Sequence, residues 1–245
     1  MEIILKIFSL IFIFDKENKI YLMAKKSTKK SKSKQTGKRK SRSQKVISRK
    51  IINFVSGNKN KLRELNELFN KNFKDIEIKQ LDIDLPELQG NPEEIVREKL
   101  KLALEKAKNL KGPVLVEDTS LCFNAYEGLP GPYIKYFLKT IKQEGLYKMA
   151  CAFEDHSAYA QSIFGLQKNQ ESEPNLFIGK TDGEIVSPRG NKNFGLLGWD
   201  PCFKPNCSKK TYAEMEEDEK NKISHRGKST KAMINWLKKN ENIFQ

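Results

Sequence analysis

The fold class predicted from the sequence is α/β, and two observations predict it. Five consecutive segments alternate between strand-like and helix-like patterns, over residues 50–56, 61–69, 76–83, 92–110 and 114–116. This β-α-β-α-β order is typical of α/β domains. The charge is also unevenly distributed, because residues 1–50 hold 16 Lys and Arg against 3 Asp and Glu, whereas the remaining residues hold 30 against 28. The body of the chain therefore has the balanced composition of a globular domain.

The first two segments carry clear strand and helix signals. Residues 50–56 read Lys-Ile-Ile-Asn-Phe-Val-Ser, a run rich in the β-branched and aromatic side chains of a buried strand. Gly57-Asn58 then turns the chain. Apolar side chains follow at helical spacing, at Leu62, Leu65, Leu68 and Phe69. This spacing predicts a helix with one apolar face.

The next three segments are bounded by proline and glycine. Residues 76–83 alternate as a second strand, which Pro86 ends. A long helix over 92–110 begins with a proline and has acidic residues in its first turn, where they favour the helix dipole. Gly112-Pro113 precede a third strand, which is predicted to end at Val116.

The C-terminal half adds further strands and helices. A glycine–proline turn over 128–132 is expected to open a helix from Tyr133 to about Ile141. A hairpin is expected around Asp182-Gly183. The expected strands cover 157–166, 176–181 and 184–186, and the expected helices cover 214–222 and 230–239.

An N-terminal extension, residues 1–49, is predicted to precede the domain at 50–245. Its apolar block, Ile3–Phe14, is too short to span a bilayer, and no membrane association is expected. The block is either a signal-peptide core or part of a segment that precedes translation from Met23. Residues 24–50 hold 13 Lys and Arg and no acidic residue, which predicts disorder. Such a tail is typical of a nuclear-import or polyanion contact, or it acts only as a solubilising segment.

The cysteines indicate an intracellular protein. Cys122, Cys151, Cys202 and Cys207 show no CxxC spacing, and the chain has only two histidines. We interpret them as reduced thiols rather than as disulfides or zinc ligands. The expected location is the cytoplasm, with entry into the nucleus through the basic tail.

Two carboxylates and a hydroxyl, Glu117, Asp118 and Thr119, follow directly on the third predicted strand. Ionised carboxylates at the end of a buried strand are costly to desolvate unless a positive group meets them. Mg²⁺ binds such oxygen ligands together with water and substrate phosphates. The pair therefore predicts either a metal–polyphosphate site or a solvated strand end.

A second candidate is a phosphate-binding turn after the first strand. Residues 56–61 read Ser-Gly-Asn-Lys-Asn-Lys and continue directly into a helix. Backbone N–H groups at a helix N-terminus and two lysines attract phosphate. The Walker spacing is absent, and an ordinary strand–glycine–helix turn also explains the run.

Three further groups of residues carry chemistry. Glu87 lies on a proline-stiffened loop, and it can share a metal with Asp118 if the second strand lies beside the third. The run from Phe194 to Pro201 is rich in aromatic residues and glycine, which suits either stacking on a planar ring or core packing. Hydrogen-bond donors also gather near a helix end, at Lys220, Ser224, His225 and Arg226.

Six motifs, in this order, resemble the inosine triphosphate pyrophosphatase family of non-standard purine NTP pyrophosphatases. The resemblance covers roughly residues 50–240 and leaves the extension uncovered. The motifs are Ser56-Gly57-Asn58-x-x-Lys61, Leu85-Pro86-Glu87-x-Gln89-Gly90, Val116-Glu117-Asp118-Thr119, Gly128-Leu129-Pro130-Gly131-Pro132, Gly198-Trp199-Asp200-Pro201 and Ser224-His225-Arg226.

This resemblance implies both a fold and a reaction. The implied fold is a long curved mixed β-sheet flanked by helices, with two lobes around a central substrate cleft, usually as a homodimer. The implied reaction is hydrolysis of ITP, dITP and XTP to the monophosphate and pyrophosphate, which cleanses the nucleotide pool. The implied cofactor is Mg²⁺, with Mn²⁺ as a substitute.

The same resemblance assigns roles to residues of this chain. Asp118 would be the catalytic base and, with Glu87, would hold the metal, with Glu117 as a supporting carboxylate. The phosphate-binding residues would be Ser56, Gly57, Asn58, Lys59, Asn60, Lys61 and Lys99, with Asp118 and Thr119 beside them. The purine-binding residues would be Phe194, Gly198, Trp199, Asp200, Lys220, His225 and Arg226.

One departure from the family pattern concerns the aromatic run. The family reads Phe-Gly-Trp-Asp, whereas Leu196-Leu197-Gly198 here separate Phe194-Gly195 from Trp199. Either Phe194 is displaced, or the three residues bulge outward and Phe194 keeps its place. Two other functions stay open: a pyrophosphatase for modified pyrimidine nucleotides, and a nucleic-acid-binding protein that acts through its basic tail. The near-neutral domain argues against the latter.

Overall fold

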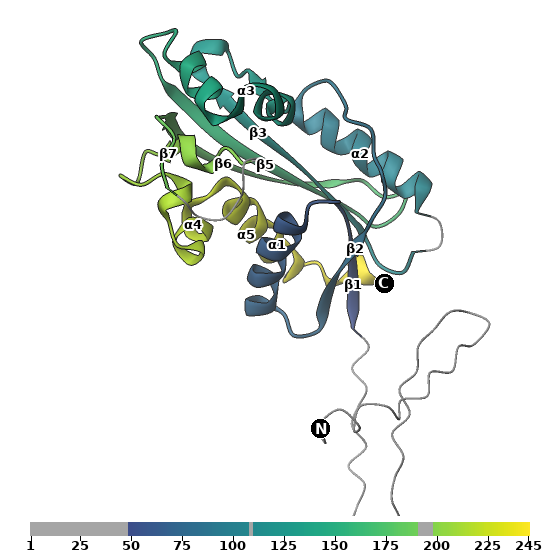
Figure 1. Cartoon of the computed structure of the whole chain (residues 1–245). Coiled ribbons are helices and arrows are strands. Elements are labelled where there is room, and N and C mark those ends of the chain that lie inside the picture. Colours follow the sequence, from purple (N-terminus) through teal and green to yellow (C-terminus); the bar gives the residue numbers. More distant parts are fainter. Residues whose placement is uncertain (1–48, 108–109, 191–197) are drawn as a thin grey trace, which may run out of the picture. The chain divides into compact units, whose positions relative to one another are not determined.

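The structure is a computed structural model, and it describes residues 49–107, 110–190 and 198–245 (Figure 1). The predicted β-α-β-α-β order is confirmed, with β1 (Lys50–Val55), α1 (Lys59–Asn72), β2 (Ile76–Leu81), α2 (Pro92–Lys106) and β3 (Val114–Phe123). The elements that follow are β4 (Pro130–Gly131), α3 (Ile134–Ala150), β5 (Ser157–Gln167), β6 (Asn175–Ile185), β7 (Phe203–Pro205), α4 (Glu217–Ile223) and α5 (His225–Leu237).

These strands form one mixed sheet of seven strands within the described residues. The order is β2-β1-β3-β5-β6-β7, and β4 pairs with β3 beside this path. β1 runs parallel to β2 and β3, whereas the other neighbours are antiparallel. The predicted α/β class and mixed sheet are therefore confirmed.

Helices cover both faces of this sheet (Figure 1). On one face, which we call the α2 face, Val96 and Leu100 of α2 pack against Val114, Val116 and Ile163. On the other, the α5 face, residues of α1 and α5 pack against the strands; the buried members of that core include Phe54, Leu65, Phe69, Leu115, Phe164 and Met233. Full burial of each such side chain contributes about 1.5–3 kcal/mol.

The third strand is longer than the sequence predicts. We expected it to end at Val116, but β3 continues to Phe123, so that Glu117 and Asp118 lie inside it. The reason is β5, which pairs with every residue of β3 from Val114 to Phe123. A partner strand on one side keeps the backbone extended past the two carboxylates.

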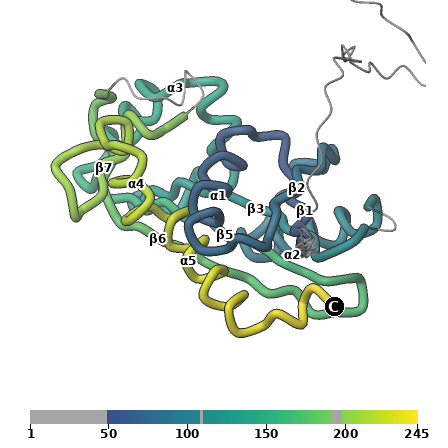
Figure 2. Tube along the Cα trace, turned by 90° about the horizontal axis from the view of Figure 1, so that it is seen from below, coloured from purple at the N-terminus to yellow at the C-terminus, as the bar shows by residue number. Residues whose placement is uncertain are grey.

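The other edge of β3 is open in its middle. β1 pairs only with Val114 and Leu115, and β4 pairs only with Leu121 and Cys122. In the described part of the chain, no strand pairs with residues 116–120 on that edge. Figure 2 shows β1, β2 and α2 toward one end of the domain and α3, α4 and β7 toward the other. The open edge lies in the middle of β3, between the residues that pair with β1 and those that pair with β4, and the two lobes around a cleft stay a prediction.

Several predicted boundaries are wrong for identifiable reasons. The expected hairpin around Asp182-Gly183 does not form, because both residues lie within β6, opposite Tyr159 and Ala158 of β5. A Cβ on Gly183 would lie 2.4 Å from the Lys204 carbonyl oxygen, so this glycine permits the close approach of β7 rather than a turn. α2 ends at Lys106 rather than Leu110.

Two further helices agree with the prediction to different degrees. The helix expected to end at about Ile141 does reach a break there, because the backbone at Lys142 is not helical, and α3 then continues beyond this kink to Ala150. α5 begins at His225, five residues before the expected start, because the Ser224 hydroxyl caps it by accepting from the Gly227 N–H at 3.0 Å.

Among the described residues, none of the helices combines the length and the apolar character that crossing a bilayer requires.

Candidate active site

The two central carboxylates point to opposite faces of the sheet. Successive side chains of a strand alternate between faces. Asp118 lies opposite Ile163, on the α2 face, and Glu117 lies opposite Phe164, on the α5 face. Both residues lie where β3 has no second partner strand in the described part of the chain. A ligand at this open edge can therefore reach groups on both faces.

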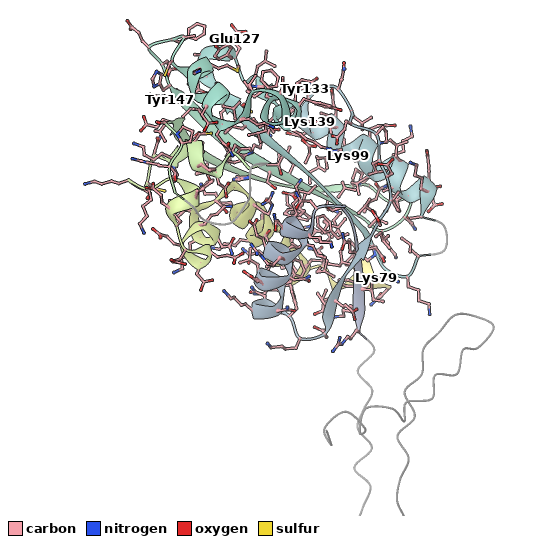
Figure 3. All side chains as sticks on the ribbon, in the orientation of Figure 1. Lys79, Lys99, Glu127, Tyr133, Lys139 and Tyr147 are labelled. Carbon is pink, nitrogen blue, oxygen red and sulfur yellow. The ribbon has the colours of Figure 1, made fainter. Side chains whose placement is uncertain are left out.

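On the α2 face, Asp118 meets Lys99 of α2, which Figure 3 labels. The Lys99 Nζ lies 2.6 Å from Asp118 Oδ1. Asp118 is 8% exposed, and its Oδ2 has no hydrogen-bond partner among the described residues. A buried carboxylate oxygen without a partner costs about 1–3 kcal/mol or more. This oxygen is therefore a place for a cation or a water molecule.

Glu87 lies on the loop after β2 rather than on a strand beside β3. The condition set from the sequence, that β2 lies beside β3, is wrong, because β1 lies between them. Glu87 is hydrogen-bonded to Lys135 of α3. Burial opposes the ionisation of Glu87, but Lys135, Lys99 and Lys61 together hold its pKa below the usual range. Lys99 also contacts Asp118, and Lys61 also contacts Glu117. The same two lysines therefore act on all three carboxylates.

The donor set at this point fits Mg²⁺. Within the described residues, no group of three or more His, Cys, Asp or Glu side chains can hold a metal ion. Two carboxylates would therefore need water and substrate phosphates to complete a coordination shell, which is the usual arrangement for Mg²⁺. The unpartnered Asp118 Oδ2 supplies a hard oxygen donor of the required kind.

On the α5 face, Glu117 is held by several donors. Its Oε1 accepts from Ser162 Oγ at 2.8 Å and from Arg226 Nε at 2.8 Å, and its Oε2 lies 3.4 Å from Lys61 Nζ. Burial would raise the pKa of Glu117, but Arg226, Lys61 and the Ser162 hydroxyl lower it to about 2. Glu117 is therefore ionised at neutral pH and does not accept a proton there.

Arg226 joins Glu117 to a carboxylate that the sequence analysis missed. Its guanidinium is hydrogen-bonded to Glu64 of α1 and donates to Thr119 Oγ1 at 3.3 Å. Burial opposes the charge, but Glu117 and Glu64 raise the pKa of Arg226 further. Three of its five N–H donors are used in contacts with Glu117, Glu64 and Thr119, so that, counting only contacts with described residues, one remains on each terminal nitrogen.

Lys220 lies beside this arginine and is buried. Its Nζ lies 2.6 Å from Asp200 Oδ2 and 3.5 Å from Glu64 Oε1. Lys220 and Asp200 are 5% and 7% exposed. The structure therefore brings together Lys220, Asp200 and Arg226 from the predicted purine-binding set, with Glu64 between the two cations.

His225 is a buried, neutral imidazole in the same region. It is 2% exposed, and neither ring nitrogen has a hydrogen-bond partner among the described residues. Burial, followed by the charges of Arg226 and Lys220, lowers the pKa of His225 well below its usual value. Its ring centroid lies 5.2 Å from that of Trp199 and 5.9 Å from that of Tyr212. The neutral ring thus holds one nitrogen that donates and one that accepts, both buried and without a partner among the described residues.

Trp199 is part of the hydrophobic core. It is 8% exposed and makes an edge contact with Phe203 at 5.6 Å, besides its contact with His225. Stacking of Trp199 on a purine stays a prediction. Phe194 lies outside the described residues, so both alternatives for its position stay open.

The predicted phosphate-binding turn is a capped helix start. Asn58 Oδ1 accepts from the N–H groups of Asn60 and Lys61 at 3.0 and 3.3 Å, and Ser56 Oγ accepts from the Asn58 N–H at 3.1 Å. The turn is exposed, and a Cβ built on Gly57 would meet nothing within 4 Å. Open space therefore adjoins the turn at the end of β1.

Comparisons of the sequence and of the structure with known proteins point to the same family. A sequence model of the Ham1 family matches residues 52–236. A HAM1 protein from Coxiella burnetii is 28% identical, with a TM-score of 0.66 over 77% of this chain and 98% of that one. The Staphylococcus aureus Ham1 protein is 24% identical, with a TM-score of 0.64 over 78% and 100%. A nucleoside-triphosphatase / dITP/XTP pyrophosphatase from Mycobacterium abscessus is 23% identical, with a TM-score of 0.57 over 76% and 99%. The last two show the shared fold alone.

Proposed function

Because the chain belongs to the Ham1 family, whose members are nucleoside triphosphate pyrophosphatases, we propose that it hydrolyses the non-standard purine nucleotides ITP, dITP and XTP. The products are the nucleoside monophosphate and pyrophosphate, and the reaction removes deaminated purine nucleotides from the nucleotide pool. The observation that carries the proposal is the open edge of β3. There, an unpartnered carboxylate oxygen on one face and an arginine with a neutral histidine on the other lie near an exposed helix start.

The nucleotide would cross this open edge. Its base would lie on the α5 face, where His225, Arg226 and Lys220 offer nitrogen groups. Its triphosphate would reach toward the α2 face, where Lys99 and Asp118 meet. Lys61, whose Nζ lies 3.4 Å from Glu117 Oε2, would supply positive charge to the phosphates, and the exposed turn at 56–61 adjoins it.

Recognition of the base would rest on hydrogen-bond donors. Hypoxanthine and xanthine carry a carbonyl oxygen at position 6, which the free N–H groups of Arg226 can satisfy. Adenine carries an amino group there, so that a donor would face a donor in a buried site. Unpaired groups of this kind cost about 1–3 kcal/mol each. A site built to form hydrogen bonds can reject the wrong analogue by as much as about 10⁴-fold.

Hydrolysis requires positively charged groups beside the phosphates and a proton acceptor for the attacking water. Asp118 Oδ2 would be the proton acceptor; its burial, its lack of a partner among the described residues and the bond of its other oxygen to Lys99 support this role. Asp118 and Glu87 would hold Mg²⁺, or Mn²⁺ in its place. When bound, this ion supplies positive charge and polarises the phosphate oxygens. Lys99 and Lys61 add charge from the protein itself.

The test is a substrate panel with purified full-length protein and Mg²⁺. ITP, dITP, XTP, ATP, GTP and a modified pyrimidine triphosphate are compared at equal concentration, with released pyrophosphate and monophosphate measured separately. We expect the first three to be hydrolysed to pyrophosphate and ATP to be poor. Intact ITP would refute the proposal, and preferential hydrolysis of the pyrimidine would support that alternative function instead.

Two variants separate the site from general charge effects. Asp118→Asn removes the proposed proton acceptor and is expected to abolish ITP hydrolysis. Glu93→Gln makes the same chemical change at an exposed position of α2 and is expected to leave activity unchanged. Binding of Mn²⁺, followed by electron paramagnetic resonance without substrate, is expected to weaken in Glu87→Gln. Equal activity of Asp118→Asn and Glu93→Gln would contradict the assignment of Asp118.

The same proposal includes a homodimer in the cytoplasm and a tail that permits nuclear entry. The basic segment at 24–50 lies outside the described residues, except for its last two, and its composition supports a nuclear-import or polyanion contact. Sedimentation measures the oligomeric state. A fluorescent reporter fused to residues 24–50 tests the tail, and a purely cytosolic signal would remove nuclear import.

A further inference from the structure

The helix α3 contains a bend that is built into its backbone. Lys142 has φ 59° and ψ −170°, a combination that is essentially restricted to glycine. Three residues later, a Cβ on Gly145 would lie 2.4 Å from the Cβ of Ile141, so that only glycine lets Ile141 fold over this position. Figure 3 labels Lys139 and Tyr147, which lie in α3 on either side of the bend. A non-glycine residue held in this conformation points to a constraint imposed from elsewhere.

The bend directs Gln143 into the protein. Gln143 directly follows Lys142 and is 8% exposed, although it is a polar residue on a helix at the domain's end. Its Nε2 donates to the carbonyl oxygen of Gly198 at 2.6 Å. A carbonyl can only accept, so this contact needs the amide group of glutamine and not a carboxylate.

Gly198 immediately precedes two residues of the base-binding side. It is the last of the three residues that interrupt the Phe-Gly-Trp-Asp pattern of the family. Trp199 packs its indole near His225, and Asp200 pairs with Lys220 at 2.6 Å. The segment 198–200 is thus held from two sides by polar contacts, with Gln143 on the side of α3 and Lys220 on the side of α4.

We propose that Gln143 is a positioning residue for the purine-binding side of the site. Its amide fixes the Gly198 carbonyl and, through the adjoining peptide, the orientation of Trp199 against His225. This inference rests on the proposed function, since it assigns Gln143 a role in binding the base of the substrate. The same contact explains the unusual backbone conformation of Lys142, because in a regular helix the Gln143 side chain would point in a different direction.

The test uses a Trp236→Phe background, in which Trp199 is the only tryptophan of the chain. Gln143→Met keeps the size of the side chain but loses the donor, and Gln143→Glu places an acceptor against the carbonyl. Lys142→Gly is the control, because glycine adopts the bent conformation freely and keeps the Gln143 contact. Melting followed by circular dichroism confirms that each variant is folded.

Three readouts distinguish positioning from general damage. In Gln143→Met, we expect the KM for ITP to rise about tenfold with kcat within about twofold, since the hydrogen bond to the Gly198 carbonyl is lost. Inhibition by inorganic tripolyphosphate, which occupies only the phosphate side, should not change. The emission of Trp199 in the ligand-free protein should shift, and acrylamide should quench it more strongly. Lys142→Gly should match the background in all three.

The outcomes separate this inference from the proposed function. Wild-type KM and wild-type Trp199 emission in both Gln143 variants would overturn it. A parallel loss of ITP and tripolyphosphate affinity would also overturn it, because that result indicates general disruption. If the parent protein leaves ITP intact, the proposed function fails, and the emission of Trp199 still decides whether Gln143 sets the position of that indole.

Discussion

Replacement of Arg226 by methionine tests how the buried charges near the site are compensated. Arg226 contacts Glu117 and Glu64, whose side chains are 1% and 3% exposed. Removal of one partner of a buried ion pair costs about 3–5 kcal/mol, because the other charge stays buried. In a domain of this size, 1 kcal/mol lowers Tm by about 2–4 °C. We therefore expect Arg226→Met to lower Tm by about 6–20 °C.

The assay is urea unfolding at neutral pH, with the free energy of unfolding extrapolated to water. Lys231→Met, at an exposed position of the same helix, is the matched control and should stay within about 0.5 kcal/mol of the wild type. Addition of Glu64→Gln to Arg226→Met removes one of the two carboxylates that have lost Arg226 as a partner. We expect the double variant to regain at least about 1 kcal/mol relative to Arg226→Met alone.

Two results would refute this reasoning. If Arg226→Met differs from the wild type by less than about 1 kcal/mol, the two carboxylates do not depend on Arg226 for compensation. If Glu64→Gln destabilises the Arg226→Met protein further, Glu64 is compensated by Lys220 alone. An unchanged m-value across the series is needed for either conclusion, since a change in m would indicate an altered unfolded state.

Three other predictions follow from the same geometry. Because the pKa of Glu117 is about 2 in the folded protein and 4.5 in the reference state, its stabilisation is present above pH 4.5 and is lost as pH falls through about 2. Over that interval, the free energy of unfolding of the wild type should fall by about 3 kcal/mol more than that of Glu117→Gln, as measured by urea unfolding at each pH. Ser162→Ala removes a 2.8 Å donor to Glu117 and should raise the KM for ITP without a change in Mn²⁺ binding; weaker Mn²⁺ binding would place Ser162 in the metal site instead. Gly57→Ala should fold normally, since a Cβ at this position would meet no atom within 4 Å, but it should weaken inhibition by tripolyphosphate. Gly179→Ala is the contrasting variant and should lower Tm, because its Cβ would lie 2.0 Å from the His225 carbonyl oxygen.

The sequence predicted those elements whose signals are local. Pro92 and the acidic first turn place the start of α2 correctly, and the apolar run at 50–56 predicts β1. The Asp182-Gly183 pair has the composition of a turn, yet Gly183 is required by the approach of Lys204 from β7. A contact between strands more than twenty residues apart leaves no local pattern, so the turn was the better-supported interpretation from sequence alone.

Glu64 shows why part of the site could not be predicted. It lies in Lys61-Leu62-Arg63-Glu64-Leu65, where a glutamate next to the apolar face of a charged helix indicates solvent exposure. It is buried because Lys220 and Arg226 reach it from 156 and 162 residues further along the chain. A buried glutamate needs such partners, and only the tertiary fold brings them. The six motifs carry most of the candidate site, but none contains Glu64, the carboxylate that joins Arg226 to Lys220.

The placement of Glu117 and Asp118 in the middle of a strand changes what each can do. At a strand end, both carboxylates would face the same solvent and could serve one metal. Inside β3, successive side chains point to opposite faces of the sheet. Asp118 therefore contacts Lys99 on the α2 face, and Glu117 contacts Arg226 on the α5 face. Under the proposed function, the adjacent residues would therefore have separate tasks, with proton and metal chemistry at Asp118 and support of base recognition at Glu117. An exchange of the two, Glu117→Asp with Asp118→Glu, keeps the net charge but should abolish activity. If the exchanged protein hydrolysed ITP at the wild-type rate, this division of tasks between the two faces would be wrong.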